Sequence, residues 1–89
     1  MRHITSVSLS SLIRVGAVHR VHLLPYTPED GGGWRMSVDH ADPGLERDVR
    51  TKRGSIRLWR STDSAIRWLS EAGYRGPIHV YTGQQGGQV

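Results

Sequence analysis

The sequence predicts an α+β fold of two layers, in which an antiparallel sheet of about four or five strands packs on one main helix with a short N-terminal helix nearby. Two observations predict this fold. Residues 34–40 alternate apolar and polar side chains, which is the pattern of a half-buried strand. Residues 62–72 place Ala65, Ile66 and Leu69 on one stripe, which is the pattern of an amphipathic helix.

Length and composition limit the fold to one domain. The 89 residues suffice for a single domain over residues 1–82, and the glycine- and glutamine-rich tail at 83–89 is expected to be disordered. The absence of cysteine excludes disulfides and thiolate zinc sites and fits a cytoplasmic protein. No apolar run is long enough for a signal peptide or a transmembrane helix, so we expect no membrane contact.

The first third of the chain predicts a helix followed by a strand. Ser8 can cap a two-turn helix over residues 8–16, and Gly16 can end it with a positive φ. The apolar residues of 17–26 indicate a strand that Pro25 stops or confines to an edge. Residues 27–33 then form a glycine-rich turn.

Three strands form a predicted meander at residues 34–40, 45–51 and 55–60. Gly54 can adopt a positive φ in the second reversal. In the third strand, alternation directs Ile56 and Leu58 inward and Arg57 and Trp59 outward.

The main helix and a last strand complete the chain. Ser61 or Thr62 can cap the helix, Gly73 ends it, and residues 76–82 form a short strand. A sheet in so short a chain keeps at least one open edge, which favours a homodimer.

Basic residues gather around the second reversal. The chain has twelve Lys and Arg against eight Asp and Glu, and six of these cations lie in residues 47–60 with one acid, Asp48. A basic sheet face with an aromatic side chain fits DNA or a nucleoprotein complex. The predicted contact residues are Arg35, Arg47, Arg50, Lys52, Arg53, Arg57, Trp59 and Arg60. An acidic protein partner, and a solvated face on which Glu46 and Asp48 pair with the arginines, stay open as alternatives.

The three tryptophans are assigned differently. Trp34 and Trp68 lie on apolar faces and are expected in the core. Trp59 is expected outside, either in contact with a partner or buried between two subunits.

The polar residues predict neither an enzyme nor a metal or cofactor site. His19 and His22 point to opposite faces of a strand, so they do not share an ion easily. His40 is expected to be a partly buried, hydrogen-bonded side chain. The acids lie mostly in turns, and no nucleophile elbow or phosphate-binding glycine loop is present.

The segment from Gly54 to Tyr74 resembles the ParC family of small partition-associated proteins of plasmids and integrative elements. The matching residues are Arg57, Trp59, Arg60, Ser61, Asp63, Ala65, Leu69 and Gly73. The opening helix and strand also resemble that family, so the likeness spans about residues 7–80. It implies a non-enzymatic accessory role in plasmid partition, with a ParA-type ATPase and a centromere-binding protein as further partners.

Two other resemblances give alternative functions. Three strands followed by a capped helix also resemble the arm-binding domain of tyrosine recombinases, which would place Arg35, Arg50 and Arg57 on DNA bases. Small basic α+β domains are similar to some anti-CRISPR inhibitors, which block nucleoprotein machines of mobile-element hosts.

Overall fold

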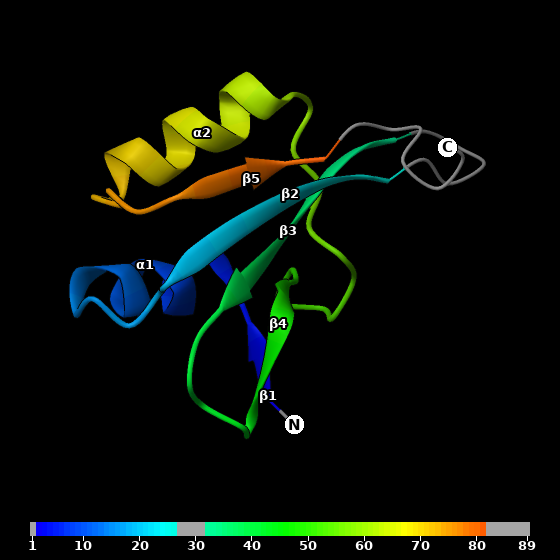
Figure 1. Ribbon diagram of the computed structural model, residues 1–89. Helices are drawn as coiled ribbons and strands as arrows, with labels where there is room; N and C mark the ends of the chain where they lie inside the picture. The colour runs from blue at the N-terminus through cyan, green and yellow to red at the C-terminus, as the bar shows by residue number, and fades with distance from the viewer. Residues whose placement is uncertain (1, 27–31, 82–89) are drawn as a thin grey trace.

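A computed structural model describes residues 2–26 and 32–81 and confirms the α+β fold with a main helix and a short N-terminal helix (Figure 1). The predicted tail and residues 27–31 of the glycine-rich turn lie outside the described residues. The elements in chain order are β1 (Arg2–Ile4), α1 (Ser6–Arg14), β2 (Arg20–Tyr26), β3 (Gly33–Asp39), β4 (Leu45–Val49), α2 (Thr62–Glu71) and β5 (Ile78–Val80).

The five strands form one sheet in the order β1-β4-β3-β2-β5. β3 runs antiparallel to both of its neighbours, whereas β1 pairs parallel with β4 and β5 pairs parallel with β2. The sheet is therefore mixed, and the expectation of a purely antiparallel sheet was wrong. The two parallel pairs arise because each edge strand is joined to the sheet through a helix and not through a hairpin.

Both helices lie on the same face of the sheet. α1 connects β1 to β2 and α2 connects β4 to β5, and both connections run between parallel strands in the same direction across the sheet. Because connections between parallel strands share one handedness, both helices are placed on the same side of the sheet. One hydrophobic core agrees with this, because it contains Leu9 and Ile13 of α1, Ala65 and Leu69 of α2, and Val21 of β2.

The strand alternation separates this core from a polar face. Val21 and Leu23 of β2 and Met36 and Val38 of β3 are fully buried. The residues between them point to the other face, which we call the outer face, and that face carries partly exposed polar side chains such as His22.

Both helices begin with a reciprocal cap. In α2, Ser61 accepts a hydrogen bond from the Ser64 backbone and Ser64 accepts one from Ser61, so Ser61 is the cap of the two residues that the sequence offered, Ser61 and Thr62. In α1 the capping residue is Thr5, and Ser8 is its partner inside the first turn, so the helix starts earlier than predicted. Within the described residues, no helix is both long and apolar enough to span a bilayer.

The third strand of the predicted meander is reduced to two isolated bridges. Ile56 pairs with Arg50 at the end of β4, whereas Trp59 pairs with Trp34 of β3. The segment thus changes its partner strand within three residues, and the regular alternation does not continue across the change. As a result Trp59 is buried at 5% exposure and Leu58 is 38% exposed, the reverse of the predicted orientation.

Gly33 makes the Trp34–Trp59 bridge possible. A Cβ atom at position 33 would lie 2.5 Å from the carbonyl oxygen of Trp59, an approach that backbone atoms do not tolerate. We expect Gly33→Ala to lower the free energy of unfolding by about 1 to 3 kcal/mol, because the bridge must shift to make room. Urea denaturation followed by tryptophan fluorescence measures this loss.

Gly44→Ala is the matched control, because a Cβ at position 44 meets only the Asp42 carboxylate at an ordinary 3.5 Å. This variant should unfold at nearly the wild-type urea concentration. Equal stability of the two variants would show that the close approach at Gly33 is not a constraint.

Candidate nucleic-acid interface

Two of the predicted contact arginines are neutralised by carboxylates of neighbouring strands. Arg35 donates to Asp48 at 3.0 Å, and Arg47 donates to Asp39 at 3.1 Å. Arg35 and Asp48 are also both partly buried, which holds the pair in place. This face is therefore not the basic sheet face that the sequence predicted.

Arg50 serves the turn that follows β4. Its Nε donates to Glu46 at 2.7 Å, and its terminal nitrogen donates to the Gly54 carbonyl oxygen at 2.7 Å. His3 donates a second hydrogen bond to the same Glu46 carboxylate at 2.9 Å. These bonds, first the one from His3 and then the one from Arg50, lower the pKa of Glu46. Arg50 therefore shapes the turn, and Glu46 balances its charge.

Arg57 joins the same segment to the start of α1. A terminal nitrogen donates to the Ser6 hydroxyl at 2.9 Å, and the guanidinium carbon lies 4.8 Å from the centroid of the Trp59 ring. Its Nε is buried and has no hydrogen-bond acceptor among the described residues. No carboxylate in that part of the chain pairs with Arg57, so its charge is not cancelled by an ion pair.

Trp59 is a core residue and not a contact residue. Its ring packs edge-on against Trp68 of α2 with the centroids 6.1 Å apart. Trp59 was expected either to contact a partner or to be buried between two subunits. Both expectations were wrong, because the side chain is buried within its own chain, against α2. Trp34 and Trp68 pack against the core as predicted.

The remaining predicted residues are exposed side chains of one loop. We call residues 50–61 the basic loop, which leaves β4 and leads to α2 (Figure 1). Lys52, Arg53 and Arg60 are exposed there and form no ion pair with any carboxylate of the described residues. The basic loop contains five of the twelve cations and no acid, so the other seven cations face eight acids. The formal charge of +4 on the chain thus originates in this loop.

Backbone hydrogen bonds hold the basic loop at both ends and at its tip. Arg50 N–H donates to the Ile4 carbonyl of β1 at 2.7 Å, and Trp59 exchanges two hydrogen bonds of 2.8 Å with Trp34. Within the turn, Thr51 N–H donates to Ser55 at 2.8 Å, and Gly54 has the predicted positive φ of 93°. The loop therefore presents its cations from a fixed backbone.

The outer face carries a hydrogen-bonded group that the sequence analysis did not identify. His22 Nε2 donates to Asp39 at 3.0 Å, so its Nδ1 can accept the hydrogen bond from Tyr81 at 2.9 Å. The hydrogen bond from His22, together with the nearby charge of Arg47, lowers the pKa of Asp39. Strand alternation puts His22 and Asp39 on the outer face, but their pairing depends on a register that the sequence does not show.

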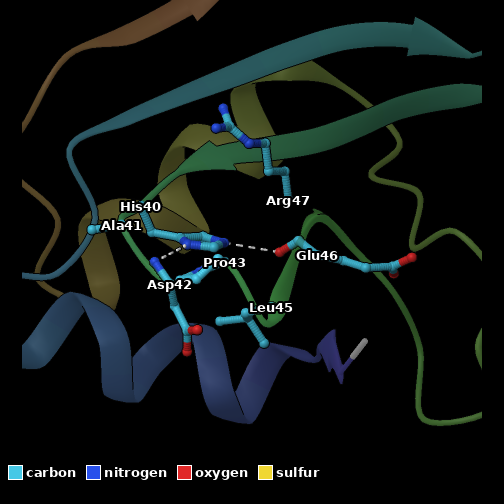
Figure 2. A pocket seen from close by; sticks show the side chains of 7 residues that line it. All are labelled: His40, Ala41, Asp42, Pro43, Leu45, Glu46 and Arg47. Atoms are coloured by element: carbon cyan, nitrogen blue, oxygen red, sulfur yellow. Dashed lines mark hydrogen bonds between the residues drawn. The ribbon is translucent and has the colours of Figure 1, made fainter.

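A hollow of about 360 Å³ beside the turn between β3 and β4 is built around His40. Its Nδ1 accepts from Asp42 N–H at 3.1 Å and its Nε2 donates to the Glu46 carbonyl oxygen at 3.0 Å. Figure 2 shows the ring inside the turn, with the side chains of Glu46 and Arg47 directed away from it. The prediction of a partly buried, hydrogen-bonded His40 is confirmed, and both ring nitrogens are used by the turn. Among the described residues, no three His, Asp or Glu side chains are grouped to hold a metal ion.

No protein-family model matches the chain, and neither the curated proteins nor the solved structures compared with it give a significant match.

Arg57→Lys tests the link between the basic loop and α1. Lysine keeps the charge but loses the planar group over Trp59 and the directed bond to Ser6. We expect the free energy of unfolding to fall by about 1 to 2 kcal/mol in urea denaturation. Arg60→Lys is the control, because Arg60 is exposed, and its midpoint should stay close to that of the wild type. A similar small effect of both changes would contradict the structural role of Arg57.

Asp39→Asn tests the His22–Asp39 pair through pH. Because the pKa of Asp39 is lowered in the folded chain, its stabilising effect is complete above the ordinary carboxyl pKa and is lost as the pH falls through the lowered value. The melting temperature of the variant should therefore lie below that of the wild type near neutral pH. The gap should close between about pH 4 and pH 2. A gap that is constant over this range would contradict the assignment.

Proposed function

We propose that this protein binds the phosphate backbone of nucleic acid through the basic loop, as an accessory protein without catalytic activity. The observation that supports this proposal is the concentration of the net positive charge in one loop. Backbone hydrogen bonds hold this loop at both ends, and it presents Lys52, Arg53 and Arg60 to solvent. A polyanion gains most from such a loop, because each contact releases a condensed counterion.

The pairing of Arg35 and Arg47 supports the loop, and not the part of the sheet around these two residues, as the contact surface. Arg35 and Arg47 already bond to carboxylates, so a phosphate would have to compete with Asp48 and Asp39. No such competition arises within the described residues at Arg53 or Arg60. A loop of this kind fits backbone phosphates and carries no element long enough to read bases along a groove.

The proposed context is DNA segregation on a plasmid or integrative element. The resemblance of residues 57–73 to ParC-type proteins supports this context. The proposal includes a ParA-type ATPase and a centromere-binding protein as partners, and a homodimer as the oligomeric state. The open edges of the sheet are β1 and β5, and the exposed Val80 on β5 is consistent with a second copy pairing there.

The geometry does not favour the alternative based on the arm-binding domain of tyrosine recombinases. That mode needs Arg35, Arg50 and Arg57 to project from the sheet toward bases. These guanidinium groups instead bond to Asp48, to Glu46 and Gly54, and to Ser6. No observation favours an anti-CRISPR inhibitor over a nucleic-acid-binding protein.

The double variant Arg53→Ala/Arg60→Ala tests the basic loop directly. For a duplex oligonucleotide, the plot of log Kd against log salt concentration should lose about two units of slope, because each phosphate contact contributes about 0.9. Fluorescence anisotropy at several salt concentrations measures the slope. Neither side chain has a partner among the described residues whose loss would destabilise the fold.

Arg14→Ala/Arg67→Ala is the matched control, because it removes the same charge from exposed positions on the two helices. Its slope should remain within experimental error of the wild type. An equal loss of slope in both double variants would mean that overall charge, and not the loop, drives binding. Absence of binding to any duplex or single strand at low salt would overturn the proposed function.

A further inference from the structure

A second hollow, of about 260 Å³, lies between the start of α1 and the basic loop. One wall contains Ser6 and Val7, and the other contains Arg50, Lys52 and Arg57. Three of the lining residues are therefore cations, and none is an acid. Glu46 balances Arg50 from outside the lining, so Lys52 and Arg57 supply two positive charges that no described carboxylate cancels.

The helix wall adds donors to these charges. The first-turn amides of a helix have no partner within the helix, and the cap of α1 satisfies only that of Ser8. The amides of Ser6 and Val7 have no acceptor within residues 2–26 and 32–81. The first turn of α1 also contains no acidic side chain that would compete for them. Amide donors beside two cations form a site for a small dianion.

We infer that this hollow binds a terminal phosphate of a nucleic-acid strand, a phosphate monoester held by Lys52, Arg57 and the amides of Ser6 and Val7. The inference rests on the proposed function, because the basic loop that binds the strand also forms one wall of the hollow. A monoester carries up to two negative charges and matches the two uncancelled cations. A phosphate inside a strand carries one charge, so it matches the two uncancelled cations less well than a monoester does.

The second helix provides an internal comparison. The Ser-x-x-Ser cap of α2 is of the same kind as the Thr-x-x-Ser cap of α1. The two helices differ in that α2 has an acidic residue, Asp63, in its first turn. Asp63 thus places a negative charge at the positive end of α2. The two helix starts therefore differ in their chemistry toward anions, although their caps are alike.

Nuclear magnetic resonance with inorganic phosphate tests the hollow itself. The backbone amide signals of Ser6 and Val7 should shift saturably, while those of Thr62 and Asp63 at the start of α2 should not. Lys52→Gln should weaken the response severalfold, and its exposed position keeps the fold intact. Equal shifts at both helix starts, or shifts that do not saturate, would overturn the site.

Oligonucleotides test the source of the phosphate. The wild type should bind a strand with a terminal phosphate about tenfold more tightly than the same strand with hydroxyl ends, the gain of one set of charge-assisted hydrogen bonds. Lys52→Gln should abolish this preference. Arg53→Gln, the same charge change outside the lining, should weaken both strands equally and keep the preference.

The outcomes separate this inference from the proposed function. Equal affinity of the wild type for both strands overturns the end-phosphate site and leaves backbone binding by the basic loop intact. Failure to bind either strand overturns the proposed function, and with it the nucleic-acid source of the phosphate, whatever the inorganic phosphate titration shows. Tighter binding of a phosphoserine peptide than of the end-phosphorylated strand would assign the hollow to a protein partner and overturn the inference as well.

Discussion

The position of the basic loop depends on backbone hydrogen bonds at its two ends. Trp59 exchanges two bonds of 2.8 Å with Trp34, and Arg50 N–H donates to Ile4 at 2.7 Å. The first contact requires a residue without a side chain at position 33, and the second requires the edge strand β1. Because both ends are fixed to the sheet, cations in the loop keep a defined place relative to α1. The position of the candidate site is therefore set by the backbone hydrogen bonds of the loop.

Charge in this protein is separated more sharply than its composition indicates. Two arginines of the sheet pair with a carboxylate one strand away, Arg35 with Asp48 and Arg47 with Asp39. The loop offers no acid within its own twelve residues, and its exposed cations lie beyond the reach of those on the sheet. A sequence count assigns the same value to an arginine in either place, whereas a phosphate at the loop would meet several cations that no described carboxylate pairs.

The sequence patterns predicted the local elements better than their connections. Alternation around Met36 and Val38, the Ser61 cap and the positive φ of Gly54 each depend on neighbouring residues, and all are present in the structure. β1 was not predicted, because three residues are too few to show a period. Trp59 was assigned to the wrong side, because alternation assumes one partner strand and the chain changes partners between Ile56 and Trp59. The ion pairs of Arg35 and Arg50 also depend on register and turn shape, which no single segment contains.

The parallel pairing of both sheet edges has a consequence for how the chain acquires this structure. Arg2 pairs with Leu45 and Val21 pairs with Ile78, so each edge joins residues from distant parts of the sequence. Closing such long segments costs chain entropy before the contacts form, so we expect this chain to fold more slowly than a helical bundle of equal length. During synthesis, β1 leaves the ribosome well before its partner β4 exists. The hydrogen bond from Arg50 to Ile4, which holds the first end of the basic loop, can thus form only after Arg50 itself has emerged.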